Sequence, residues 1–111
     1  MNITAKVNIK DYSSEVKHAM RQQVEIALKA IGQTAEGHAK DECPVDTGNL
    51  RNSIANEHDD LTVYVGTNVE YAPYVEYGDY NHNTGKKHFL RDSIANHGDE
   101  YKSILKAALD T

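Results

Sequence analysis

The first forty residues carry two different hydrophobic patterns in succession. From Ile3 to Ile9 every second position is apolar, which predicts a half-buried strand over residues 3–9. Farther along, the apolar positions recur every three or four residues, which predicts an amphipathic helix over about 13–41. We expect Gly32 and Gly37 to weaken its second half and Pro44 to end it, because a residue before proline avoids the α conformation. The predicted apolar face consists of Val16, Met20, Val24, Ala27, Leu28, Ile31, Ala35 and Ala39.

The next segment predicts a short capped helix followed by a β-hairpin. Asp46 or Thr47 can cap a helix that starts at Gly48. Alternating apolar and polar residues after this helix are typical of a hairpin. Its parts in chain order are a strand over 54–58, a turn at 59–60, a second strand over 61–65, and a closing segment at 66–68.

Tyrosines at a spacing of three follow the hairpin, at Tyr71, Tyr74, Tyr77 and Tyr80. This spacing favours a helical turn, whereas the proline and glycine nearby break regular structure, so we predict a helix-like turn that runs into a strand. The tyrosines can serve core packing or subunit contact equally well, because tyrosine is common in both settings. Residues 78–87 are polar and contain glycine, which predicts a loop.

The last predicted element is a second amphipathic helix that starts at Phe89 and is interrupted at Gly98. Its beginning repeats an earlier stretch, because LRDSIAN at 90–96 matches LRNSIAN at 50–56 in six of seven positions. The flanking sequences differ, so we interpret the match as convergence on a capped helix start rather than as an internal repeat.

Length and composition limit the number of domains and the classes of protein that the chain can belong to. With 111 residues and a mass of 12.4 kDa, the chain is predicted to form a single domain over 1–111. No stretch approaches the ~18 apolar residues that a membrane span needs. Cys43 is the only cysteine, which excludes an internal disulfide, fits a reducing cytoplasm and indicates a small buried hydrophobic residue.

Charge is distributed unevenly along the chain. The net charge is −5, and residues 41–80 hold nine acidic residues against one basic residue, Arg51. A protein that binds duplex DNA electrostatically carries a basic stripe, so direct duplex binding is not expected. We expect Arg51 to form a partly buried ion pair with one of the surrounding acids, or a contact with a backbone carbonyl, rather than a contact with DNA.

Candidate chemistry is sparse. His82 and His88 flank the predicted loop near Asp79, but no histidine pair has the spacing of a metal-binding motif, so no metal site is expected. Cys43 follows a helix rather than preceding one, so nothing lowers its pKa in the manner of a catalytic thiol. The sequence contains no phosphate-binding loop, and we expect no cofactor.

Three blocks carry a family resemblance: PVDTGNLRNSI at 44–54, YVGTNVEYAPYVEYG at 64–78, and FLRDSI at 89–94. Together with the flanking helices, they resemble the gene-product-ten-like family of long-tailed phages, of the HK-ninety-seven type, whose members are tail components, tail completion proteins or head–tail joining proteins. Members often carry proline just before the Phe-Leu-Arg block, where this chain has His88. The start of the last helix is therefore expected to be less fixed than usual.

The resemblance implies an α+β fold without catalytic activity. Combined with the predicted elements, this is a small antiparallel sheet packed against a long N-terminal helix and a C-terminal helix. The resemblance also implies a place in the virion neck, after assembly in the cytoplasm of the host bacterium. There, copies of the chain would form a ring, expected to be a hexamer. Other neck or tail proteins would be the partners of this ring. DNA would pass through the lumen without specific binding, and the acidic middle segment would repel it.

Roles follow for the residues of the matching blocks. One group is expected to build the structural motif, with Gly48 permitting an unusual backbone or a close approach. It consists of Pro44, Asp46, Thr47, Gly48, Leu50 and Arg51. A second group comes from the tyrosine-rich segment and the predicted polar loop rather than from the blocks alone, and is the candidate interface with neighbouring subunits or partners. It consists of Tyr71, Tyr74, Tyr77, Tyr80, Asn81, His82, Lys86 and Lys87. The alternative is a small cytoplasmic enzyme or ligand-binding module that uses the tyrosine-rich segment and the loop histidines.

Overall fold

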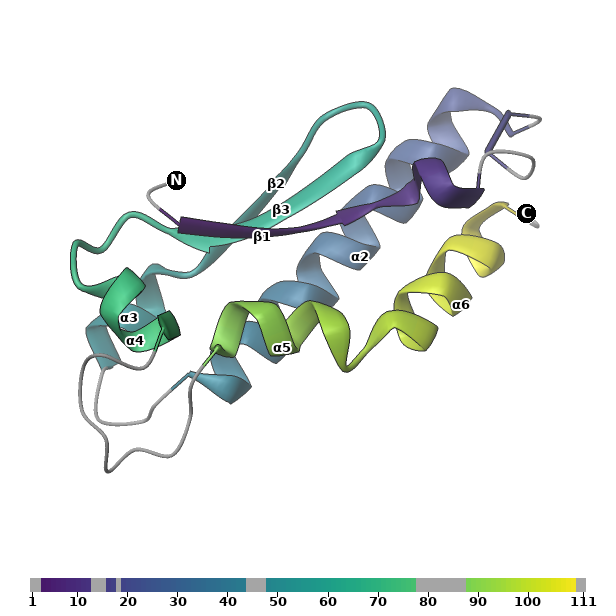
Figure 1. Cartoon of the computed structure of the whole chain (residues 1–111). Coiled ribbons are helices and arrows are strands. Elements are labelled where there is room, and N and C mark those ends of the chain that lie inside the picture. The colour runs from purple at the N-terminus through teal and green to yellow at the C-terminus, as the bar shows by residue number, and fades with distance from the viewer. Residues whose placement is uncertain (1–2, 13–15, 18, 44–47, 78–87, 110–111) are drawn as a thin grey trace.

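The computed structural model describes residues 3–12, 16–17, 19–43, 48–77 and 88–109. Within them the chain is an α+β fold in which a three-stranded antiparallel sheet packs on one long helix, with two further helices alongside (Figure 1). The molecule is elongated, with extents of 47 × 22 × 18 Å. The predicted fold class is confirmed.

The sheet is built from β1 (Ile3–Asn8), β2 (Ala55–His58) and β3 (Thr62–Thr67) in the order β1-β3-β2. β1 pairs antiparallel with β3, from Ile3 opposite Thr67 to Asn8 opposite Thr62. The alternation predicted for β1 is confirmed, because its odd-numbered side chains are half-buried and its even-numbered ones are exposed. A 3-10 helix, η1 (Ile9–Tyr12), follows directly.

The predicted hairpin exists, but β3 is longer than expected. Local turn signals place Gly66 and Thr67 in a closing segment, yet both belong to the strand, where they pair with Thr4 and Ile3 of β1. Pairing with a strand about sixty residues away is invisible to such signals, which explains the error. The turn at Asp59 is confirmed, since its Oδ1 accepts the Leu61 and Thr62 amides at 3.1 and 3.0 Å.

The long helix α2 (Arg21–Glu42) begins eight residues later than predicted. Met20 is extended at its N-cap, and its amide donates to the Gln23 side chain at 3.0 Å. Before it, residues 16 and 17 are helical and the chain breaks from the helix at 19–20, where the Ala19 amide donates to the Val16 carbonyl and both residues are half-buried. Met20 itself is 66% exposed and is not part of the apolar face. The predicted end is close, with Cys43 as C-cap.

The remaining helices are short. α3 (Gly48–Ser53) starts where predicted, and α4 (Ala72–Tyr77) covers the tyrosine-rich turn. The predicted C-terminal helix is two helices, α5 (Phe89–Ala95) and α6 (Gly98–Leu109). The break lies at residues 96–97, and Gly98 begins α6 rather than interrupting a continuous helix. The predicted loop at 78–87 and the strand expected after the tyrosine turn lie outside the described residues.

The core lies between the sheet and α2 and continues toward α5 and α6 (Figure 1). Cys43 is buried there, as predicted. Gly32 of α2 faces the sheet so closely that a Cβ atom would lie 2.5 Å from Oδ1 of Asn56. The largest fully buried side chains come from every layer and include Phe89, Ile9, Leu28, Ile31, Leu50, Leu90, Leu105, Val63 and Val65.

Candidate assembly surface

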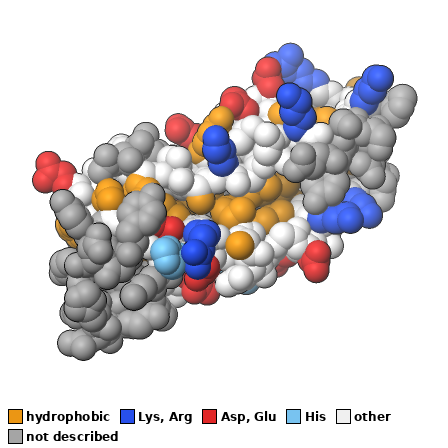
Figure 2. All heavy atoms as spheres, in the orientation of Figure 1, with side chains coloured by type: hydrophobic (Ala, Val, Ile, Leu, Met, Phe, Trp, Pro, Cys, Tyr) orange, Lys and Arg blue, Asp and Glu red, His pale blue; other side chains and the backbone are white. Residues whose placement is uncertain are grey.

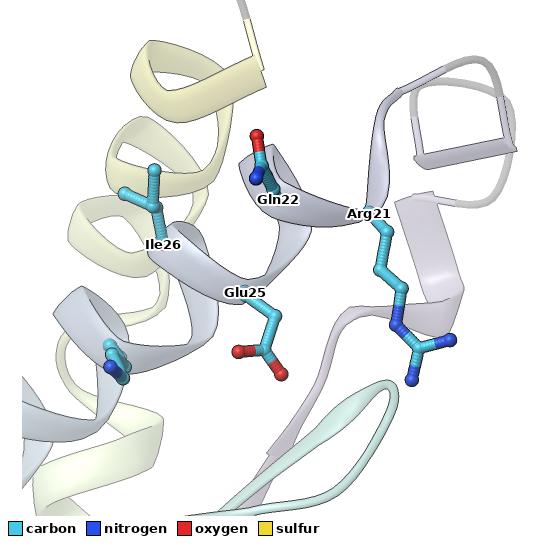
Figure 3. A pocket seen from close by; sticks show the side chains of 5 residues that line it. Arg21, Gln22, Glu25 and Ile26 are labelled. Carbon is cyan, nitrogen blue, oxygen red and sulfur yellow. The ribbon is translucent and has the colours of Figure 1, made fainter.

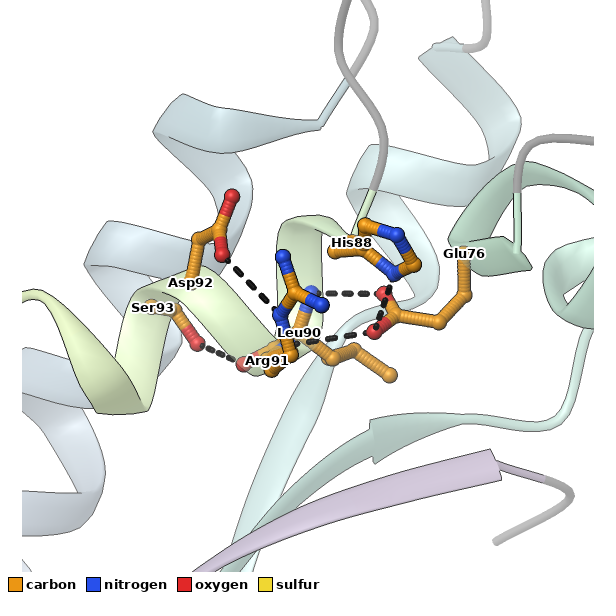
Figure 4. Close-up of polar contacts among 6 residues, drawn as sticks. All are labelled: Glu76, His88, Leu90, Arg91, Asp92 and Ser93. Carbon is orange, nitrogen blue, oxygen red and sulfur yellow. Dashed lines mark hydrogen bonds and ion pairs between the residues drawn. The ribbon is translucent and has the colours of Figure 1, made fainter.

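At one end of the molecule, a buried carboxylate binds the first turn of α5. Glu76, in the last turn of α4, is only 6% exposed and points at the start of α5 (Figure 4). Its two oxygens accept the backbone amides of Leu90 and Arg91 at 2.8 and 3.2 Å. These amides belong to the first turn of a helix and have no partner within it, so the carboxylate satisfies both and complements the helix dipole.

Two opposing influences act on the acidity of Glu76. Burial raises the pKa of its carboxyl above the usual value, while the bonds from Leu90 and Arg91 and the nearby His88 lower it in part. Nδ1 of His88 lies 3.9 Å from Oε2 of Glu76. The net direction is upward, so the charged form of Glu76 is held at this site at a cost in stability.

His88 joins the same contact through its backbone. Its amide donates to the Glu76 carbonyl at 2.9 Å, and its φ of 57° is the one positive value among the described non-glycine residues. Proline can adopt neither feature, because its φ is fixed near −65° and it has no amide proton. In this chain, Glu76 and the positive φ of His88 together define the start of α5. The expectation of a less fixed helix start is a comparison with other family members and stays a prediction.

The structural motif after α2 is only partly described. Pro44, Asp46 and Thr47 lie outside the described residues. Leu50 is fully buried and anchors α3, as expected. Arg51 pairs with one of the acids, Asp41, at 3.9 Å.

Two expectations about this motif need correction. The Arg51–Asp41 pair is exposed rather than partly buried, with 46% and 75% of the two side chains accessible. Gly48 was expected to need an unusual backbone or a close approach. It has no positive φ, and a Cβ atom at this position would meet no described neighbour within 4 Å, so Gly48 is an ordinary first residue of α3.

A hydroxyl network fixes α3 against the sheet. Ser53 Oγ lies 2.5 Å from Oγ1 of Thr67, the last residue of β3, and also donates to the Leu50 carbonyl at 2.6 Å. Thr67 is 1% exposed and accepts the amide of Val69 at 3.1 Å. Sequence reasoning misses this role of Thr67, since local signals assign the residue to a closing turn.

The predicted tyrosine interface is described in part. Tyr71 is half-buried and packs against the core, which favours the packing role for this residue. Tyr74 and Tyr77 belong to α4, but their side chains lie outside what the structure describes. The remaining interface candidates, Tyr80, Asn81, His82, Lys86 and Lys87, lie outside the described residues.

A groove that the sequence did not reveal runs along the free edge of β1. Figure 2 shows a band of hydrophobic side chains across the middle of the face that carries β1, α5 and α6. Two hollows, of about 330 and 210 Å³, lie along this edge, and Lys6 and Ile94 line both. Arg91 borders the first hollow and Lys102 the second, so basic side chains accompany the apolar floor.

The backbone of β1 also presents hydrogen-bonding groups to this groove. The Ile9 amide donates to Leu61, which stands opposite it in the register of β1 and β3. Hydrogen-bonded and outward-facing positions alternate along an antiparallel pair, so the backbone groups of Thr4 and Lys6 point away from β3. An edge of this kind accepts a partner chain readily.

A second exposed surface lies on the N-terminal half of α2. Arg21, Gln22, Glu25, Ile26 and Lys29 line a hollow of about 700 Å³ there (Figure 3). Ile26 is 61% exposed, an unusual position for a large apolar side chain. Arg21 also approaches Asp60 of the hairpin turn at 3.8 Å, but both side chains are almost fully exposed.

Comparison with known proteins identifies the family of the chain. Residues 8–78, more than half of the sequence, match the family model described as "Bacteriophage HK97-gp10, putative tail-component". The chain belongs to this family. The first two of the three resembling blocks lie inside the matched range, and the Phe89 block lies beyond it. No curated protein and no solved structure shows a significant match.

Membership of the HK97-gp10 family assigns the chain to a group of phage structural proteins, which places it in the virion. It favours this role over the alternative of a small enzyme or ligand-binding module. In the described part of the chain, no helix is long and apolar enough to cross a bilayer.

The fold also gathers three metal-ligating side chains that are far apart in the sequence. His38 of α2, His97 at the α5–α6 junction and Glu100 of α6 place one potential ligand atom each within 4.8 Å of one another. The search for paired histidines along the sequence could not find this group, because His38 and His97 are brought together only by helix packing.

Proposed function

We propose that this protein joins or completes the head–tail connection of a long-tailed phage or prophage. It does so as one subunit of a ring, sixfold in our expectation, around the DNA channel of the neck. The observation that carries the proposal is the match of residues 8–78 to a phage tail-component family. The single domain over 1–111 is the ring subunit, and its partners are further copies of itself and other neck or tail proteins.

The groove along β1 supports assembly through unlike surfaces. In a ring, each subunit contacts the next through two different patches, and such contacts close when the rotation between subunits fits. The groove offers an apolar floor, outward backbone groups and basic side chains at Lys6 and Arg91. These basic side chains at the rim would favour an acidic patch on the next copy.

The segment 78–87 is the second proposed contact. Its two ends are joined where Glu76 and His88 bond through backbone and side chain. We propose that the tyrosine-rich turn and this segment, with Tyr80, His82, Lys86 and Lys87, contact a neighbouring subunit or neck protein.

The acidic residues in the middle of the chain would let DNA pass through the ring. A channel lined with negative charge repels the phosphate backbone, so DNA passes without being retained. The protein would then act by shape and charge, with no bond made or broken.

The test is complementation of a phage that lacks this gene. Wild-type protein supplied from a plasmid is expected to restore infectious titre, and without it DNA-filled heads lacking tails should accumulate in electron micrographs. Tailed, infectious particles in the complete absence of the protein would contradict the proposed function.

Variants of the same assay separate the two contacts. Lys6→Glu reverses the charge that borders both hollows of the groove and should reduce titre at unchanged melting temperature, while Lys106→Glu at an exposed position of α6 serves as control. A short Gly-Ser linker in place of residues 79–86 should also abolish joining without changing the circular dichroism spectrum. Full titre for either variant removes that contact from the proposal and leaves the function itself intact.

A further inference from the structure

The cluster formed by His38, His97 and Glu100 brings three potential metal ligands close together. The imidazole rings of His38 and His97 stack in parallel, with ring centroids 3.5 Å apart and an angle of 2° between the ring planes. Nε2 of His38 lies 2.5 Å from Oε1 of Glu100. The Tyr101 ring stands edge-on to His38, with centroids 6.3 Å apart. Three ligand-bearing groups thus converge on one point between α2 and α6.

The backbone holds each of the three groups in a defined position. His38 precedes the fully buried Ala39 on α2. The carbonyl of His97 accepts the amides of Glu100 and Tyr101, so His97 caps the N-terminus of α6. Residues three apart on a helix lie on one side, which places Glu100 beside His97. Tyr101 is 3% exposed and its hydroxyl donates to the Ser93 carbonyl, which fastens the start of α6 to α5.

We propose that His38, His97 and Glu100 form a binding site for a divalent transition-metal ion of the zinc class. Two imidazoles and one carboxylate are a donor set that suits Zn²⁺, Co²⁺ and Ni²⁺, whereas Mg²⁺ and Ca²⁺ prefer oxygen ligands alone. The His38 and Glu100 side chains are 23% and 49% exposed, so water can occupy the remaining coordination position. The bound ion ties α2 to α6.

The site must tighten when the ion enters. Bonds of about 2.0–2.2 Å in a tetrahedral arrangement separate neighbouring ligand atoms by about 3.3 Å. The three ligand atoms already lie within 4.8 Å, so changes of side-chain torsion close the difference. One ion cannot lie in the planes of two stacked rings at once. One imidazole therefore rotates out of the stack, and its resonances should shift most on binding.

The experiment uses the full chain with any histidine tag removed. Co²⁺ is titrated while its visible absorption bands are recorded, and melting temperature is measured with and without 100 µM ZnCl₂. We expect one equivalent of Co²⁺ to bind and Zn²⁺ to raise the melting temperature by about 5 °C or more. Addition of 5 mM MgCl₂ should change neither observable.

Three variants locate the site. His97→Ala and Glu100→Gln should each weaken Co²⁺ binding at least tenfold and abolish the Zn²⁺-induced rise in melting temperature. His58→Ala removes a histidine of β2 that is not part of the cluster and whose ring nitrogen lies 3.1 Å from the Asp59 carbonyl, and it should bind like wild type. Glu100→Gln keeps the proposal testable if His97→Ala fails to fold. Absence of binding at 100 µM metal, or equal binding by wild type and Glu100→Gln, would overturn the proposal.

Discussion

Gly32 on α2 provides the sharpest test of how the sheet meets the long helix. Its Cβ position lies 2.5 Å from Oδ1 and 3.0 Å from Cγ of Asn56, while Val63 Cγ1 at 3.4 Å is an ordinary contact. An alanine here must displace the Asn56 side chain. That side chain donates to Oε1 of Glu36 at 2.8 Å, in a half-buried position. The substitution thus exchanges a helix-propensity gain for the loss of a hydrogen bond to a charged group.

The sizes of these two contributions decide whether Gly32→Ala stabilises or destabilises the protein. Replacing glycine by alanine within a helix stabilises by about 1 kcal/mol. A hydrogen bond to a charged group contributes about 1.5–3 kcal/mol. We therefore expect Gly32→Ala to lower the free energy of unfolding by about 0.5–2 kcal/mol. Gly37 is the matched control on the same helix, because it is exposed and has no described neighbour within 4 Å of its Cβ position. Gly37→Ala should stabilise by about 0.5–1 kcal/mol.

Urea denaturation followed by circular dichroism at 222 nm measures both variants. A second comparison isolates the cause, because Asn56→Ala removes the atoms that a methyl group at position 32 would meet. In that background Gly32→Ala should become stabilising, and the double-mutant cycle should show a coupling of about 1–3 kcal/mol. If Gly32→Ala alone is as stable as Gly37→Ala, then the close approach of the sheet to α2 has no energetic consequence and the reasoning is refuted.

Three further predictions concern the other contacts. The raised pKa of Glu76 means that its stabilising contribution is complete below the usual glutamate pKa of 4.5 and declines as pH rises through the folded-state pKa. The difference in unfolding free energy between wild type and Glu76→Gln should therefore shift against wild type as pH rises above 4.5, and a difference independent of pH would contradict this. His88→Pro should cost about 2 kcal/mol or more in urea unfolding, whereas His88→Gly, which permits the positive φ and keeps the amide, should cost little; equal effects would show that backbone conformation is unimportant there. Arg51→Ala should change stability by less than about 0.5 kcal/mol because its pair with Asp41 is exposed, and a loss above about 1 kcal/mol would refute that assignment.

Local hydrophobic patterns predicted the helices and strands well where the spacing of the apolar residues matches the face that is buried. The alternation over 3–9 gave β1, and the three-to-four spacing gave most of α2. The errors fall at boundaries that tertiary contacts decide. α2 starts at Arg21 because a break at 19–20 separates it from the helical residues 16–17, and β3 extends to Thr67 because β1 pairs with it.

The candidate surfaces depend even more on tertiary structure. The groove along β1 exists because an edge strand and two helices lie next to one another, and no local pattern encodes that neighbourhood. Likewise, His38 and Glu100 are 62 residues apart, so their contact follows from the packing of α6 on α2. What the sequence could predict was the family, since the PVDTG and tyrosine blocks lie within the matched range.

The repeated heptapeptide shows how context takes over from local sequence. In both copies the leucine is buried and the serine three residues later donates to its carbonyl, at 2.6 Å for Ser53 and 2.7 Å for Ser93. The local structure is thus the same at residues 50–53 and 90–93. After it the two segments diverge, because Ser53 meets Thr67 and the chain continues into β2, whereas Ser93 accepts Tyr101 at its carbonyl and remains helical. The shared letters thus accompany the same helical turn in both places, while the residues that contact each turn and the elements that follow it differ.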